Sequence, residues 1–139
     1  MTESNRQYAY LSFTGSFDPA DITARLGVQP TETWCAGDLN PRNQRERSFS
    51  AWHLRSRLPE DSDLEAHVKD VLEQTVSGAS VVEQLAREYG GCMQLVGYFH
   101  AEYPGLHFER EMVAELSARG LSVDFDLYYL YSDRRETTS

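Results

Sequence analysis

The chain has 139 residues, a length that fits one domain over residues 1–139, with residues 1–6 and 132–139 as polar, flexible tails. Acidic residues outnumber basic ones by 22 to 13, for a net charge of −9, which argues against a nucleic-acid partner because phosphates require a broad basic face. No apolar run approaches the roughly 20 residues of a membrane helix, and the start lacks the regions of a signal peptide, so we expect a cytoplasmic protein without a membrane partner.

The alternation of apolar and polar residues, together with helix-capping and turn-forming residues, predicts a strand, a helix and two further strands in the first part of the chain. Residues 8–14 alternate apolar and polar side chains, as a half-buried strand does. A short helix follows, with Asp18 as its N-cap and Gly27 after its end. Strands are then predicted over 28–35 and 48–56, joined by a loop of about ten residues rich in turn formers.

Two capping boxes and two apolar stripes predict the helices of the second part. Ser62 with Glu65 opens one helix, and Ser80 with Glu83 opens the next. The remaining predicted segments are a strand over 93–101, a helix along Phe108, Met112 and Leu116, and a strand over 121–131.

The resulting order, β-α-β-β-α-α-β-α-β, predicts an α+β fold. A ferredoxin-like α/β sandwich is the economical architecture, with the helices on one face of the sheet. The two ends of the chain resemble each other, which suggests a pseudo-repeat of two split βαβ units.

A tyrosine-rich face should lie opposite the helices, because successive side chains of a strand point to opposite sides of the sheet. If Leu11, Phe13 and Phe125 are buried under the helices, Tyr10 and Asp126 must lie on the other face. The same alternation gathers there Tyr8, Tyr10, His53, Arg55, Tyr98, His100, Asp124, Asp126 and Tyr128.

Three interpretations of this face stay open. It is a solvated face whose aspartates pair with Arg55 or with nearby arginines, or a protein-protein surface, since Tyr and Arg are enriched in interfaces. The third is a small-molecule or catalytic site around Asp124, Asp126 and His100, where neighbouring carboxylates raise one pKa. We expect no metal and no cofactor, because the histidines show no ligand spacing and no nucleotide-binding motif occurs.

One span of this acidic chain is locally basic. Residues 42–57 contain five arginines and one glutamate, a local charge of +4. They begin in the predicted loop, at Arg42, Arg45 and Arg47, and continue into the following strand with Arg55.

Three segments resemble a bacterial family known as domain of unknown function 4279. They are FDPADITARLGVQPTETWCAGD, SAWHLRS and LSVDFDLYY, and together the similarity covers nearly the whole chain. The matching positions are Asp18, Pro19, Ile22, Thr23, Leu26, Gly27, Trp34, Gly37, Asp38, Trp52 and Asp126.

The resemblance implies that Trp34 and Trp52 end two strands and anchor the core, which holds the loop between them at both stems. Gly37 then supplies the turn, and Asp38 either caps its own loop or holds Arg42 or Arg45. Small α+β families of this kind often look like immunity or accessory proteins of bacterial toxin systems.

Our hypothesis is a non-enzymatic protein-binding or immunity-type module, with a protein partner such as a toxin. The site is the junction of the arginine-rich loop with the tyrosine and aspartate face, where positive and negative groups meet. The alternative is a small-molecule-binding protein or enzyme with a pocket around Asp124, Asp126 and His100. Dimerisation through the tyrosine face is a further option that the sequence leaves open.

Overall fold

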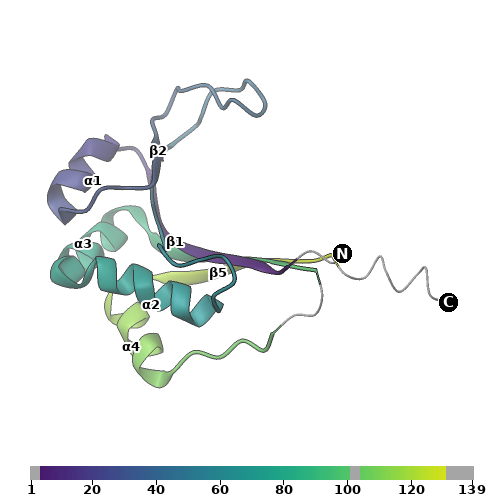
Figure 1. The fold of residues 1–139 in the computed structure, drawn as a ribbon. Coiled ribbons are helices and arrows are strands. Elements are labelled where there is room, and N and C mark those ends of the chain that lie inside the picture. The colour runs from purple at the N-terminus through teal and green to yellow at the C-terminus, as the bar shows by residue number, and fades with distance from the viewer. Residues whose placement is uncertain (1–3, 101–103, 131–139) are drawn as a thin grey trace.

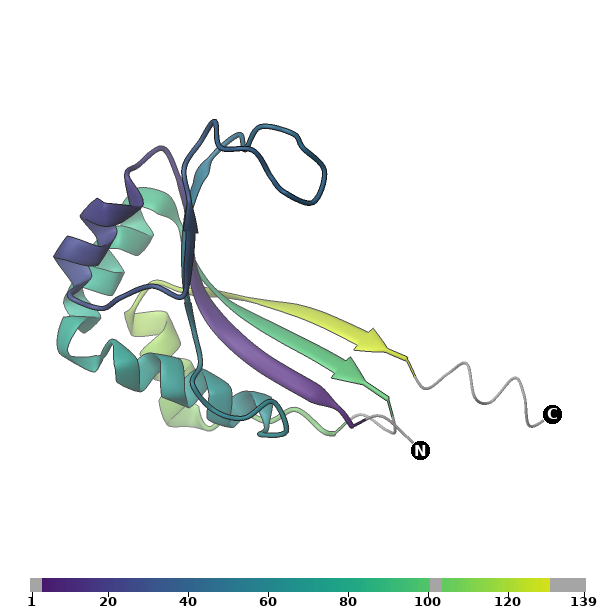
Figure 2. The same ribbon diagram turned by 45° about the horizontal axis from the view of Figure 1, so that its top comes forward.

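The computed structural model describes residues 4–100 and 104–130 as one five-stranded sheet with helices on one face (Figure 1). A turned view shows the helices on one side of the sheet and the loop between the second and third strands projecting on the other (Figure 2). The elements are β1 (Arg6–Gly15), α1 (Pro19–Leu26), β2 (Glu32–Trp34), β3 (Ser50–Arg55), α2 (Leu64–Gln74), the 3₁₀ turn η1 (Val76–Gly78), α3 (Ala79–Tyr89), β4 (Gly91–Phe99), α4 (Arg110–Ala118) and β5 (Ser122–Tyr129).

The strands lie side by side in the order β2-β3-β1-β4-β5. The central strand β1 is antiparallel to β3 and to β4, and β2 is antiparallel to β3. Strand β5 runs parallel to β4 and forms one edge of the sheet. Strands and helices are mixed along the chain, so the α+β class is confirmed.

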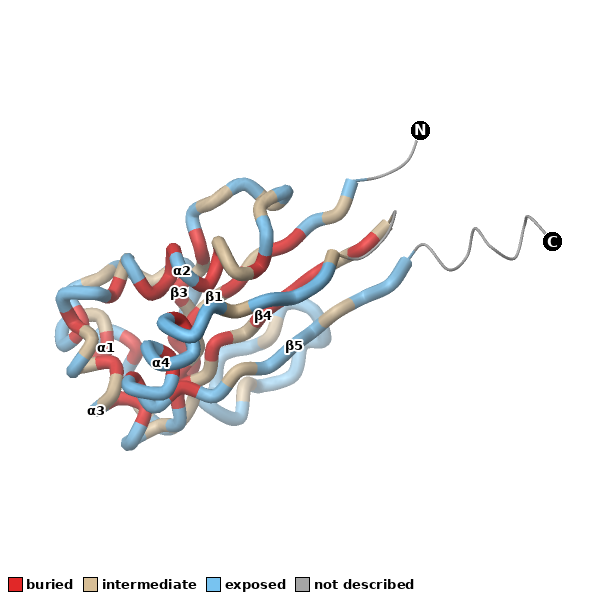
Figure 3. Tube along the Cα trace, turned by 90° about the horizontal axis from the view of Figure 1, so that it is seen from below, coloured by how far each residue is buried: buried red, intermediate tan, exposed pale blue. Residues whose placement is uncertain are grey.

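The core lies between the sheet and the helices. Phe13 of β1 is fully buried between its register partners, Trp52 of β3 and Gly91 of β4. Val68 of α2 and Leu85 of α3 cover this layer and are also fully buried. Burial alternates along β1, as the predicted period of two requires, whereas β5 is mostly exposed (Figure 3).

The residues predicted to cap the two ends of α1 are confirmed. The Asp18 side chain accepts a hydrogen bond from the Ala20 amide at 3.0 Å, which satisfies one of the free donors at the helix start. At the other end Gly27 has a φ of 75°, a left-handed conformation that glycine adopts without strain.

The two predicted capping boxes are wrong. Helix α2 begins after Asp63 and α3 begins after Gly78, one or two residues away from the predicted serines. The carboxylate of Glu65 instead accepts a hydrogen bond from the Glu109 amide at 3.0 Å, near the start of α4. Glu65, which the local motif assigned to the capping of α2, therefore makes a tertiary contact with the start of α4 instead.

The bounds of several elements and the burial of Phe125 also differ from the prediction. Strand β1 begins at Arg6, inside the stretch predicted as a tail, while the predicted tail over 132–139 lies outside the described residues. Strand β2 has only three residues. It ends at Trp34 because the next amide, that of Cys35, donates its hydrogen bond to the Asp38 side chain and not to the backbone of β3. Phe125 faces the helices but is 51% exposed, because β5 is an edge strand that the short α4 covers only in part. No helix among the described residues is long and apolar enough to cross a membrane.

Candidate functional site

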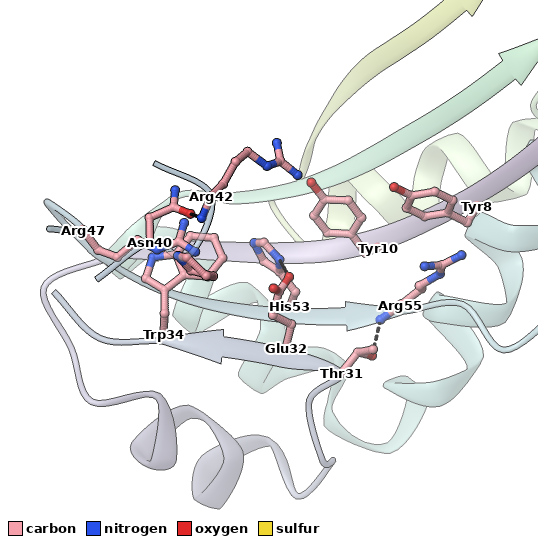
Figure 4. A pocket seen from close by; sticks show the side chains of 11 residues that line it. Tyr8, Tyr10, Thr31, Glu32, Trp34, Asn40, Arg42, Arg47, His53 and Arg55 are labelled. Carbon is pink, nitrogen blue, oxygen red and sulfur yellow. Dashed lines mark hydrogen bonds and ion pairs between the residues drawn. The ribbon is translucent and has the colours of Figure 1, made fainter. Parts of the chain in front are cut away.

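Four rings form a continuous strip across three strands on the face opposite the helices. Tyr8 and Tyr10 of β1 have ring centroids 6.3 Å apart, and Tyr10 lies 4.7 Å from the ring of His53 on β3. His53 in turn meets Trp34 of β2 edge-on at 5.2 Å. We call these four residues the aromatic strip (Figure 4).

Each end of the aromatic strip carries an arginine. The guanidinium carbon of Arg55 lies 3.8 Å from the centre of the Tyr8 ring, and that of Arg47 lies 3.9 Å from the Trp34 ring. Such cation–π contacts contribute about 0.5–2 kcal/mol, depending on how far water is excluded. Arg55 also pairs with Glu60 at 2.6 Å, and not with an aspartate of the same face as one interpretation expected. The two cations are thus held in place before any ligand arrives.

The arginine-rich loop is an ordered arm, which we define as residues 35–49. Its two sides are joined by backbone hydrogen bonds from Gly37 to Arg47 at 2.8 Å, from Arg47 to Asp38 at 2.7 Å, and from Asn40 to Arg45 at 2.8 Å. At its base the Asp38 carboxylate accepts a hydrogen bond from the Cys35 amide at 2.8 Å. Of the two roles predicted for Asp38, capping its own loop is the one the structure has.

The tip of the arginine arm is shaped by asparagine side chains. Asn40 accepts a hydrogen bond from the Arg42 amide at 2.9 Å, and Asn43 accepts one from the Arg45 amide at 3.0 Å. Such Asx turns replace the missing backbone partners of a tight loop. Gln44, which lies between Asn43 and Arg45, has a φ of 61°, an uncommon conformation for a residue with a side chain.

The arm and the aromatic strip enclose a hollow of about 720 Å³. In Figure 4 the Arg42 side chain extends from the arm toward Tyr10, while Arg47 lies above Trp34. Three arginines and one carboxylate, Glu32, line the hollow, so it is cationic in a chain whose net charge is −9. Its lining residues are Tyr8, Tyr10, Thr31, Glu32, Trp34, Asn40, Pro41, Arg42, Arg47, His53 and Arg55.

The aromatic strip forms the floor of the hollow, and the hydrogen-bonding groups of His53, Tyr8 and Tyr10 on it are neutral near pH 7. Burial lowers the pKa of His53, an effect that Glu32, 3.5 Å from its Nδ1, opposes only in part. Burial also raises the pKa values of Tyr8 and Tyr10, so both hydroxyls keep their protons and remain donors. The floor therefore offers hydroxyl and imidazole groups, and the arginines supply its positive charge.

The other half of the open face is acidic, and we define it by Tyr98 of β4 and by Asp124, Asp126 and Tyr128 of β5. The rings of Tyr98 and Tyr128 are stacked at 5.0 Å, and a hydrogen bond with Asp126 raises the pKa of the Tyr128 hydroxyl. Both aspartates are exposed. Asp124 pairs in register with Gln94, which also pairs with Tyr10, so the aromatic strip and the acidic half share one face.

Most of the predicted site residues belong to one of these two halves. Tyr10, Arg42, Arg47 and Arg55 line the hollow, and the acidic half holds Tyr98, Asp124, Asp126 and Tyr128. Arg45 does not line the hollow; it lines a second recess of about 250 Å³ on the arm, which shares Trp34, Asn40 and Arg47 with the hollow. His100 follows the end of β4, where its amide donates to Asn5 at 2.7 Å.

Sequence reasoning misplaced Trp34 and missed Glu32. Trp52 is fully buried, but Trp34 belongs to the aromatic strip, where its Nε1 donates to the Phe49 carbonyl at 3.0 Å. Glu32 pairs in register with His53, and Thr33 pairs with Trp52. Alternation along β2 places Glu32 and Trp34 on the open face once this pairing is known, and the pairing is the signal that the sequence lacked.

One group of side chains has the composition of a metal site. The ligand atoms of Glu65, His107 and Glu109 lie within 4.8 Å of one another at the surface beside α2 and α4. Glu65 already accepts a hydrogen bond from the Glu109 amide, and His107 Nε2 lies 3.4 Å from the Glu109 carboxylate. The cluster thus has internal partners and lies apart from the hollow.

Comparison with known proteins gives a family and no individual relative. Neither a curated protein nor a solved structure matches the chain. The family described as "Domain of unknown function (DUF4279)" matches residues 5–130, a range that includes the arm, the aromatic strip and the acidic half. The chain therefore belongs to the DUF4279 family.

Proposed function

We propose that the protein is a non-enzymatic binding module whose hollow receives an acidic segment of a protein partner. The observation that carries the proposal is the charge of the hollow, where three arginines, of which Arg55 is already paired with Glu60, meet one lining carboxylate in a chain of net charge −9. Arginine binds carboxylates through paired hydrogen bonds, and Tyr, Trp and Arg are the residue types that contribute most to interface energies.

The side chains and backbone that form the hollow are held in fixed positions, which supports the same function. Arg47 and Arg55 are held on rings, and the arm is braced by its own hydrogen bonds, so a partner does not have to immobilise them. Preorganisation of this kind raises affinity by lowering the entropy lost on binding. The buried Nε of Arg47 has no hydrogen-bond partner among the described residues, which leaves a donor to be satisfied.

The wider setting of the proposal rests on analogy. The strands β2, β3, β1 and β4 are each antiparallel to the next, and this order with helices on one face supports placing the fold with the ferredoxin-like sandwiches, extended by β5. An immunity or accessory role toward a bacterial toxin in the cytoplasm is one form of the function and has support from fold-level likeness alone.

A small anionic molecule is the second candidate, because the hollow is concave and its central His53 has a side chain only 14% exposed. The alternative pocket around Asp124, Asp126 and His100 has less support, since none of these three residues lines the hollow.

Tryptophan fluorescence tests the proposed function directly. Trp34 lines the hollow and Trp52 is buried in the core, so a ligand in the hollow changes the emission of Trp34 while Trp52 reports the fold. The probe is a short Asp- and Glu-rich peptide with one phenylalanine, and a Lys-rich peptide is its control. We expect saturable binding of the acidic peptide, and no signal in Trp34→Phe.

Charge reversal on one arm separates the hollow from general electrostatics. Arg42→Glu and Arg47→Glu should each weaken peptide binding about tenfold or more, because each variant loses at least one charge-assisted hydrogen bond to the peptide. Arg45→Glu is the matched control, because it makes the same charge change on the same arm outside the hollow. Equal losses in all three variants would contradict the proposal. Binding of inorganic phosphate or AMP without binding of the peptide would favour the small-molecule candidate.

A further inference from the structure

We infer that the acidic segment received by the hollow is β5 of a second copy of the chain, so that the protein forms a two-fold symmetric dimer through its open face. The inference rests on the proposed function, which it deepens by naming the partner. It is carried by charge complementarity between the two halves of one face and by the position of these halves in the strand order.

Each half of the open face has an excess of the charge that the other half lacks, although Glu32 lines the hollow and the Arg6 guanidinium lies 4.6 Å from the centre of the Tyr98 ring. The hollow presents Arg42 and Arg47, and no salt bridge among the described residues engages either of them. The acidic half presents Asp124 and Asp126, both exposed and likewise outside every salt bridge of the described residues. Two cations and two carboxylates on one face are thus available to a partner.

No salt bridge among the described residues joins the two halves within one chain. Three strand spacings separate β3, which forms the hollow floor, from β5, which carries the aspartates. At roughly 4.8 Å per spacing this is about 14 Å across the sheet. The opposite charges of the two halves are therefore open to another molecule.

The strand order places the halves symmetrically about β1, which is the middle strand of five. A two-fold axis parallel to β1 and lying between two facing sheets brings β2 and β3 of one copy over β4 and β5 of the other. Because such a contact is isologous, the hollow of each copy meets the acidic half of its partner at the same time. In this arrangement the partner's Asp124 lies level with Tyr10 along the strands, and the stacked Tyr98 and Tyr128 rings lie level with Arg6, beyond the Tyr8 end of the aromatic strip.

Face-to-face docking is favoured over pairing at the sheet edge. Antiparallel pairing of two β5 strands would bring Asp124 and Asp126 of one copy beside the same aspartates of its partner. Like charges on adjacent strands are destabilising, and charged edge strands are a common means of preventing edge pairing. The same aspartates are favourable when they meet the arginines of a facing sheet.

Sedimentation equilibrium of the full chain at near-physiological salt tests the dimer. At chain concentrations of tens of micromolar we expect the wild-type mass to be that of two chains, which corresponds to a dissociation constant of about 10 μM or lower. Arg42→Asp combined with Arg47→Asp should weaken association about 100-fold or more, and so should Asp124→Arg combined with Asp126→Arg. Arg45→Asp, which changes the charge of the arm outside the hollow, should leave the dimer intact.

Mixing the two double variants provides the decisive readout. Each variant alone faces like charges in both contacts, whereas their mixture restores opposite charges in both, so a heterodimer should form. A monomeric wild type would overturn the inference. So would a mixture that stays monomeric although both variants keep the wild-type melting temperature. If a double variant fails to fold, Arg42→Gln and Asp126→Asn replace it, and unchanged association in both would equally overturn the dimer.

The peptide titration separates failure of this inference from failure of the proposed function. A monomeric wild type that binds the acidic peptide in its hollow refutes the second copy as partner and leaves the binding function standing. A monomeric wild type that does not bind the peptide refutes both. A dimer that the acidic peptide dissociates supports both, because peptide and β5 then compete for one hollow.

Discussion

Replacing Asp70 by asparagine should destabilise the fold at the end of β3, next to the hollow. The Asp70 carboxylate is 6% exposed and accepts hydrogen bonds from the Arg57 amide at 2.8 Å, from its guanidinium at 2.7 Å and from Gln74 at 3.0 Å. Gln74 also donates to the Arg55 carbonyl at 3.1 Å. This network therefore fixes the chain that carries Arg55 into the hollow wall.

The size of the effect follows from what the substituted side chain retains. An asparagine would keep the shape and one acceptor, but it would lose the charge that strengthens the bonds from Arg57. Hydrogen bonds to a charged group are worth about 1.5–3 kcal/mol each, a value to be reduced here because the Arg57 side chain is 64% exposed. We expect Asp70→Asn to lower the free energy of unfolding by about 2 kcal/mol, which lowers the Tm by roughly 7 °C in a chain of this size.

The pH dependence gives an independent check. Burial alone would raise the pKa of Asp70, but the hydrogen bonds from Arg57 and Gln74 outweigh it and hold the pKa below its ordinary value. The stabilisation is therefore complete above the unfolded pKa of about 3.9 and is lost as the pH falls through the lower folded value. Urea unfolding should show a constant difference between wild type and variant near pH 7 and a shrinking one below about pH 4. Equal stability at pH 7, or a difference that does not shrink in acid, would refute this reasoning.

Three further predictions concern the core and the thiols. A Cβ at Gly97 would lie 2.6 Å from the Phe99 ring, so Gly97→Ala should lower the free energy of unfolding by about 1–3 kcal/mol in calorimetry. Cys35 is exposed, whereas burial raises the pKa of the Cys92 thiol, so Ellman's reagent should modify Cys35 first and Cys92 slowly. Burial lowers the pKa of His67, so stability should fall as the pH drops below about 6.5, and His67→Gln should reduce that dependence in urea titrations.

The parts of the fold that could be predicted depend on rules that act over a few residues. Phe13 and Tyr10 lie on the sides that alternation assigned, because the period of a strand is fixed by its backbone. Helix α1 begins and ends where Asp18 and Gly27 predict, because capping is decided by neighbours in sequence. The open face with its tyrosines and aspartates follows from these local rules.

The shape of the site could not be predicted, because distant residues determine it. Arg45 and Arg47 look equivalent in sequence, but the hydrogen bonds of Arg47 with Gly37 and Asp38 turn its side chain toward Trp34 and the hollow. Trp34 was expected in the core, and only the pairing of β2 with β3 shows that it faces outward. The hollow, unlike the face that it lies on, is thus a tertiary feature.

The net charge of the chain restricts how such a dimer can form. Two copies of charge −9 repel each other at long range, and this repulsion is weakened once the Debye length is about 8–10 Å, as it is near physiological salt. Contacts of Arg42 and Arg47 with Asp124 and Asp126 act at a few ångströms in a partly water-excluded hollow, so the same salt screens them less. Association should therefore be weak at very low salt, strongest near physiological ionic strength and weaker again near 1 M, where the Debye length is about 3 Å. A hollow that bound only a small anion would show a much smaller gain as salt rises from very low values, because an anion of one or two charges is repelled far less by the chain than a second copy of charge −9 is.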